Sequence, residues 1–148
     1  MGSGRLAVSV ESVRPDCSLR DAAHRMIRDA VHVLLVTEGG NDAVLGILTN
    51  RDLVRQVAAG VDAGATTVAT CMSKPVTTLP ETASRSELSA KMRVHGIRHV
   101  PLVDESGVVH RIVSLEDLLC EMGQEIADLS AAIQGEFQHE VEQTKRDR

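Results

Sequence analysis

The chain has 148 residues and a net charge of −5 at pH 7, and its 43% hydrophobic and 25% charged residues match an ordinary soluble globular protein. It contains neither Trp nor Tyr, and basic residues cluster only at Lys145-Arg146, so no nucleic-acid partner is expected. No apolar run approaches the roughly 18 residues of a membrane span, and no secretory signal is recognised. We therefore expect no membrane partner either.

Residues 8–60 predict a strand, a helix, two strands and a second helix. An extended stretch ends at Pro15-Asp16, and Ser18 followed by Asp21 is a helix-capping signal. Apolar residues then recur at helical spacing in one stripe, which consists of Leu19, Ala22, Ala23, Met26, Ile27 and Ala30. Short apolar runs at 33–36 and 44–48 predict buried strands, and the residues 39–42 between them favour a turn. A second helix is expected from Thr49.

Residues 72–120 repeat this order. Pro15 corresponds to Pro80 and Asp52 to Asp117, and both pairs are 65 positions apart. Ser84 and Glu87 predict a helix start, strands are expected at 100–103 and 108–113, and another helix is expected from Ser114. The Gly-, Ala- and Thr-rich residues 61–71 are interpreted as a linker. The pattern predicts an α+β protein made of two like half-domains packed face to face.

Residues 121–148 continue the last helix. Apolar residues alternate four and three apart along it, at Leu115, Leu119, Met122, Ile126, Leu129 and Ile133, followed by Phe137 and Val141. This is a narrow seam on a helix of about 25 residues, weakened by Gly123 and Gly135. The seam either packs on its own domain or meets a second helix, and its length beyond a small core favours the second helix.

A Thr/Ser-x-x-Asp pattern stands where the last helix of each half begins, as Thr49 with Asp52 and as Ser114 with Asp117. In the simplest interpretation both are capping boxes that start helices. The same geometry also suits a nucleotide, because a helix N-terminus attracts phosphate and a carboxylate accepts hydrogen bonds from ribose hydroxyls. Arg51 adds a positive charge beside Thr49.

These residues resemble the CBS (cystathionine-β-synthase) domain family in the form of a tandem pair, or Bateman module, over about residues 8–120. The resemblance depends on a hydrophobic strand that runs into Thr/Ser-x-x-Asp, present as residues 46–53 and 111–118, and on His99-Val100-Pro101-Leu102-Val103 and Met72-Ser73-Lys74-Pro75-Val76-Thr77. It implies two β-α-β-β-α repeats related by pseudo-twofold symmetry. It also implies an adenosine ligand, with Asp on the ribose and Ser or Thr toward the phosphate.

The resemblance further implies an aliphatic slot for the base, formed by Val10 and Val13, by Val31-His32-Val33 and by the corresponding second-half residues. The candidate site residues are therefore Thr49, Asn50, Arg51, Asp52, Ser114, Glu116, Asp117, Val31, Val33, Arg98, His99, Val76 and Thr77. Three residues depart from the family pattern: Arg111 stands in place of glycine, Leu34 in place of proline, and Glu116 where the first half has Arg51. We expect the two sites to differ, with the first dominating phosphate recognition.

The sequence thus predicts a regulatory, non-catalytic module that senses AMP, ADP, ATP or S-adenosylmethionine, requires no cofactor and acts through an unidentified effector protein. The alternative is a ligand-independent dimerisation or scaffold module with degenerate sites, favoured by Arg111 and Glu116. A nucleotide-hydrolysing enzyme ranks third. A homodimer is expected through the Ala-rich first helix and the C-terminal helix.

The His and Cys residues do not predict a metal site. His95 and His99 are separated by a helix-to-strand transition, and Cys17, Cys71 and Cys120 are scattered along the chain. Wide cysteine spacing without a CxxC motif indicates reduced thiols in a cytoplasmic protein.

Overall fold

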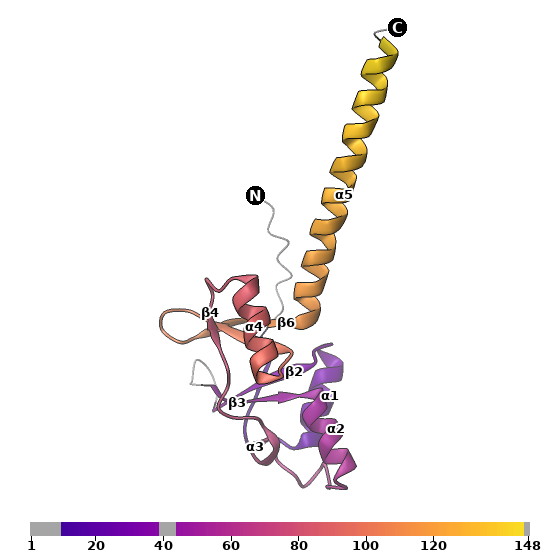
Figure 1. Ribbon diagram of the computed structural model, residues 1–148. Coiled ribbons are helices and arrows are strands. Elements are labelled where there is room, and N and C mark those ends of the chain that lie inside the picture. The colour runs from indigo at the N-terminus through magenta and orange to yellow at the C-terminus, as the bar shows by residue number, and fades with distance from the viewer. Residues whose placement is uncertain (1–9, 39–43, 147–148) are drawn as a thin grey trace. The chain divides into compact units, whose positions relative to one another are not determined.

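The computed structural model describes residues 10–38 and 44–146 (Figure 1). The chain divides into two compact units, residues 1–113 and 114–148. The first unit contains two three-stranded sheets, and the second is built on one long helix. The turn expected at residues 39–42 lies outside the described residues.

The first sheet follows the predicted order of elements. It comprises β1 (Ser12–Val13), β2 (Val33–Thr37) and β3 (Val44–Thr49), with α1 (Leu19–Arg28) between β1 and β2 and α2 (Asn50–Ala58) after β3. Strand β2 is central, parallel to β1 and antiparallel to β3.

The second half repeats this order after a short helix, α3 (Val68–Cys71). Its elements are β4 (Leu79–Pro80), α4 (Arg85–His95), β5 (His99–Val103) and β6 (Val109–Ser114), and β5 is the central strand. Helix α5 (Leu115–Arg146) follows. The repeated β-α-β-β-α order and the α+β class predicted from the sequence are confirmed.

The helices begin where the capping signals predict. The side chain of Ser18 accepts a hydrogen bond from the Asp21 backbone N at 3.1 Å, and Ser84 with Glu87 forms a full capping box at α4.

The predicted stripe of α1 is wrong at its end. The cap residue Asp29 closes the helix, Ala30 has a φ of 53° outside it, and Ile27 is 80% exposed.

Residues expected as a linker pack into the first half. Val68 of α3 is fully buried in a cluster with residues of α1 and the first sheet, and its backbone N donates to Cys17 O at 2.8 Å. Thr67 forms an isolated bridge with Ser18. The segment therefore closes the first half as well as connecting it to the second.

Strand β2 is buried on both faces. Leu34 and Val36 belong to the cluster under α1, whereas Val33 and Leu35 form a second cluster with Ile112 of β6. Because successive side chains of a strand point to opposite faces, β2 contributes to the core of its own half on one side and to the contact between the halves on the other. The predicted packing of two half-domains is confirmed by this shared cluster.

The second unit is helix α5, which has 32 residues instead of the roughly 25 predicted. At 1.5 Å per residue it is about 48 Å long. Across the described part of the chain, no helix combines the length and apolar character needed to cross a membrane.

Candidate functional site

The Thr49–Asp52 motif is a capping box at the start of α2. Asp52 Oδ2 accepts hydrogen bonds from the Thr49 backbone N at 2.8 Å and from Thr49 Oγ1 at 3.0 Å. The Asp52 backbone N donates to Thr49 Oγ1 at 3.3 Å. The capping interpretation is therefore confirmed. Asp52 Oδ2 and Thr49 Oγ1 both form hydrogen bonds within the capping box.

The second carboxylate oxygen of Asp52, Oδ1, is not part of the capping box. The residue is only 7% exposed, yet Oδ1 has no closer partner among the described residues than Arg55 Nη1, in a 3.8 Å ion pair. The Arg55 side chain is 64% exposed, so this pair is weakly held. A carboxylate oxygen that is accessible on an otherwise buried residue and makes no short hydrogen bond is suited to accept one from a ligand hydroxyl.

The first three backbone N–H groups of α2 differ in whether they donate a hydrogen bond. Asn50 N donates to His32 O at 3.0 Å, and Asp52 N is bonded to Thr49 Oγ1. In the described part of the chain, Arg51 N has no such cap partner. An arginine in the first turn also opposes the positive end of the helix dipole, and a bound anion would offset that repulsion.

The first-half candidates lie at one end of the sheet, but their side chains point to two faces. Val33 pairs with Thr49 across β2 and β3, and Val33 shares the cluster between the halves with Val10. Val31 and Val13 instead pack in the cluster under α1. The valine side chains expected to form one slot are thus divided between two clusters.

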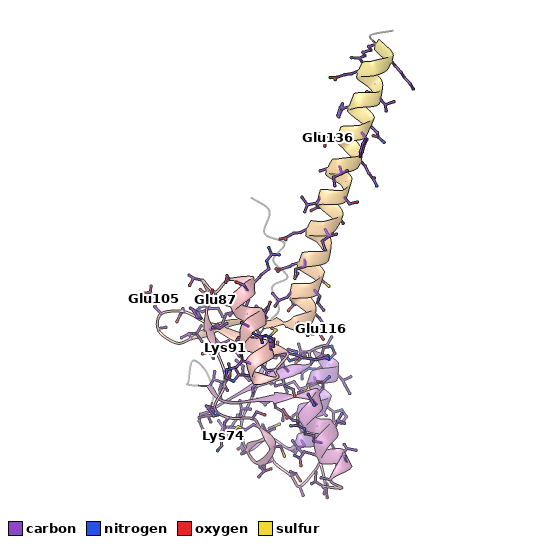
Figure 2. The ribbon with its side chains drawn as sticks, in the orientation of Figure 1. Lys74, Glu87, Lys91, Glu105, Glu116 and Glu136 are labelled. Carbon is purple, nitrogen blue, oxygen red and sulfur yellow. The ribbon has the colours of Figure 1, made fainter. Side chains whose placement is uncertain are left out.

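The second-half motif has the same local geometry. The Ser114 backbone N donates to Asp117 Oδ2 at 2.8 Å, and Asp117 N donates to Ser114 Oγ at 3.0 Å. Figure 2 marks Glu116, the second residue of α5, as Arg51 is the second residue of α2. Of the other candidates, which lie in the first unit, Val76, Thr77 and His99 are half-buried and Arg98 is exposed.

The cysteines are free thiols. The pKa of Cys17 is raised, first by burial and then by the nearby carboxylates Asp21 and Asp16, which keeps the thiol protonated and poorly nucleophilic. In the ranges 10–38 and 44–146, no group of three or more His, Cys, Asp or Glu residues is placed to hold a metal ion.

The match to known proteins follows the repeat. The family model of the CBS domain matches residues 7–59 and again residues 68–123. The chain belongs to the CBS-domain family. This confirms the tandem CBS pair expected from the sequence, and each match ends just beyond one Thr/Ser-x-x-Asp motif.

Relatives of similar length support the same assignment. The CBS domain-containing protein YhcV of Bacillus subtilis is 34% identical over 114 residues, which cover 76% of this chain and 79% of YhcV. A CBS-domain-containing protein of Agrobacterium tumefaciens superimposes with a TM-score of 0.69 at 32% identity, over 75% of this chain and 82% of that one.

A CBS domain protein of Pyrobaculum aerophilum, solved in complex with AMP, shares the fold with a TM-score of 0.67 at 24% identity, over 78% of this chain and 92% of that one. Other curated relatives are longer. This chain spans 44% of an uncharacterized protein of Methanopyrus kandleri and 21% of the inosine-5′-monophosphate dehydrogenase of Nitrosopumilus maritimus.

The sequence interpretation missed one structural feature beside the site. Gly46 of β3 lies against Met72, and a Cβ added at Gly46 would lie 2.5 Å from Met72 Sδ. Ser73 then pairs with Ile47, with N–O distances of 3.1 and 2.8 Å. An isolated glycine inside an apolar strand is a signal of close approach by another segment, and it was available in the sequence.

Proposed function

We propose that this CBS pair is a non-catalytic regulatory module that binds an adenosine nucleotide at the first-half motif. The observation that carries the proposal is the buried Asp52 carboxylate, with Oδ1 available at a helix N-terminus. The AMP complex of the Pyrobaculum aerophilum CBS protein supports this class of ligand.

In the proposed complex, each part of the nucleotide has a matching group. Asp52 Oδ1 accepts a hydrogen bond from a ribose hydroxyl, because Oδ2 is occupied by Thr49. The phosphate lies at the N-terminus of α2, near the Arg51 backbone N–H and guanidinium. Thr49 Oγ1 already accepts from Asp52 N and donates to Asp52 Oδ2, so its part is to hold the carboxylate in place.

We propose that the motif of the second half binds a nucleotide more weakly than the first, or does not bind one. Glu116 is exposed in the first turn of α5, where Arg51 stands in α2, and a carboxylate there repels phosphate. This observation also favours the second candidate function, a scaffold whose nucleotide sites are degenerate. In either function the module is proposed to be cytoplasmic, consistent with its free thiols.

A homodimer is proposed as the assembly. Ala22 is fully buried in the chain's own core, so it does not provide the close helix contact expected from the sequence. The outer surface of α1 and α2 instead exposes Ile27, Val54 and Val57 by 80%, 67% and 75%. A groove of about 210 Å³ lies between these two helices. Apolar surfaces of this kind mark protein interfaces.

The test is calorimetric titration with AMP, ADP, ATP and S-adenosylmethionine, with GMP as the base control. At a hundredfold excess over Kd, ligand should stabilise the folded protein by about 2.7 kcal/mol, and the melting temperature should therefore rise. Binding of an adenosine ligand that is lost in Asp52→Asn and kept in Glu105→Gln, a change at an exposed turn carboxylate, supports the proposal. No binding of any adenosine ligand refutes it and leaves the scaffold.

A further inference from the structure

Helix α5 carries an apolar stripe whose large side chains are exposed on the helix. Five residues of the predicted seam are exposed and are the part called the seam from here on: Leu119, Met122, Ile126, Leu129 and Ile133, at 59%, 48%, 67%, 67% and 56%. Their spacing of three and four residues is the a and d spacing of a heptad, with positions 119, 126 and 133 as a and 122 and 129 as d. Soluble monomers seldom expose a continuous patch of this kind.

The apolar seam covers one face of α5 and ends before the helix does. The opposite side, the f positions of the heptad, holds Gln124, Ala131 and Gln138, which are all exposed. Past Ile133 the pattern breaks, because Glu136 (Figure 2) takes the next d position and Phe137 and Val141 lie beside the stripe. The apolar contact surface is thus confined to about 21 Å of one face, from residue 119 to residue 133.

We propose that the seam pairs with the same seam of a second copy of this chain, as a short parallel coiled coil. Isoleucine at a with leucine at d, as in Ile126 and Leu129, is the combination that favours parallel two-stranded coils. In a parallel pair each layer contains two identical residues, so Ile126 meets Ile126 of the second copy and Leu129 meets Leu129.

The residues that flank the seam fit a second copy better than a different partner. In coiled coils the charges at e and g select the partner. Between residues 118 and 132, these positions hold Leu118, Gly123, Glu125, Ser130 and Ala132. Glu125 at g faces Ser130 at e of the second copy, so parallel self-pairing creates no like-charge contact. A single charge at these positions also gives no pattern by which an oppositely charged helix would be selected.

The size of the seam predicts a contact that reinforces a dimer without making one alone. A fully buried aliphatic side chain removes roughly 60–120 Å² from water. Ten side chains, each about 60% exposed before pairing, therefore bury on the order of 400–700 Å², below the roughly 1,000 Å² of a stable interface. The pairing rests on the dimer proposed above for its affinity, because a linked first contact raises the effective concentration of the second.

Cysteine crosslinking of the full-length chain tests the geometry. In a background with Cys17, Cys71 and Cys120 replaced by Ser, and folding verified by circular dichroism, Met122→Cys and Leu129→Cys are introduced separately. Parallel pairing brings each residue next to its own copy, so both variants should form disulfide dimers on mild oxidation, whereas Ala131→Cys on the opposite face should not. An antiparallel pair can join at most one of the two positions, and that result would overturn the proposal.

Sedimentation of uncrosslinked chains tests the contribution of the seam. Ile126→Asp with Leu129→Asp should weaken dimerisation at least tenfold, whereas Ala131→Asp, which places the same charge on the opposite face, should leave it unchanged. A dimer with unaltered affinity in the seam variant overturns the α5 pairing and leaves the dimer through α1 and α2 standing. A chain that is monomeric at high micromolar concentration overturns both. Calorimetry with AMP on the seam variant shows separately whether the nucleotide proposal holds.

Discussion

Removing the carboxylate of Asp52 separates helix capping from ligand binding. Asp52→Ala deletes the acceptor of two hydrogen bonds, from Thr49 N at 2.8 Å and Thr49 Oγ1 at 3.0 Å, and loss of a cap costs about 0.5–2 kcal/mol of stability. In the proposed complex it also deletes the ribose contact. Hydrogen bonds to charged groups contribute about 1.5–3 kcal/mol, so the Kd for AMP should rise roughly 10- to 140-fold.

Glu87→Ala is the matched control. Glu87 (Figure 2) makes the same capping box at α4, accepting from Ser84 N and Ser84 Oγ at 2.7 Å each, but it is exposed and lies outside the candidate site. Both variants should lose stability in urea unfolding, and only Asp52→Ala should lose AMP affinity in calorimetry. An unchanged Kd in folded Asp52→Ala, or an equal loss in Glu87→Ala, would refute the assignment of Asp52 to the ribose.

Three further outcomes are expected. Arg51→Glu should weaken binding of ATP and AMP more than binding of adenosine, because only the first two carry phosphate; equal losses in calorimetry would place Arg51 away from the phosphate. Gly46→Ala should destabilise the fold by about 1–3 kcal/mol in urea unfolding, since its Cβ would overlap Met72, whereas Gly123→Ala, with open space around it, should stabilise α5 by about 0.5–1 kcal/mol. His110 has a raised pKa because its ring forms a hydrogen bond with Asp104 at 2.7 Å. Its stabilising effect relative to His110→Gln should therefore be complete below the ordinary pKa of 6.5 and disappear as the pH rises through the pKa of the folded state. NMR titration should show a lower pKa of His110 in Asp104→Asn, and an unchanged pKa would contradict the contact.

The features predictable from the sequence are those fixed by neighbours in the chain. A capping box joins residues three apart, so Thr49 with Asp52 and Ser84 with Glu87 could be recognised without knowledge of the fold. The repeated order of strands and helices follows equally from local periodicity. The end of α1 was harder to place, because Ala30 continues the apolar spacing although its backbone has already left the helix.

The features that were missed depend on contacts between distant segments. The run Val33–Val36 is apolar throughout, so periodicity gives no indication of which residues face α1 and which face the second half. Only the packing of the folded chain places Leu34 and Val36 in the cluster under α1, and Val33 and Leu35 in the cluster with Ile112. The burial of Val68 is likewise accompanied by a hydrogen bond from its backbone N to Cys17 O, about fifty positions earlier, which a linker-like composition does not reveal.

The same strand connects the candidate site to the contact between the halves. Asn50 N is bonded to His32 O and Thr49 pairs with Val33, while the side chain of Val33 packs in the cluster that contains Ile112 of the second half. A ligand regulates only if it binds two arrangements of the protein with different affinity. A nucleotide held by Asp52 and the start of α2 would touch the end of β2, and any displacement of β2 changes the packing of Val33 and Leu35 against Ile112. The proposed site at that strand end would therefore give ligand binding a short route to the relative packing of the two CBS repeats, with no element beyond β2 required.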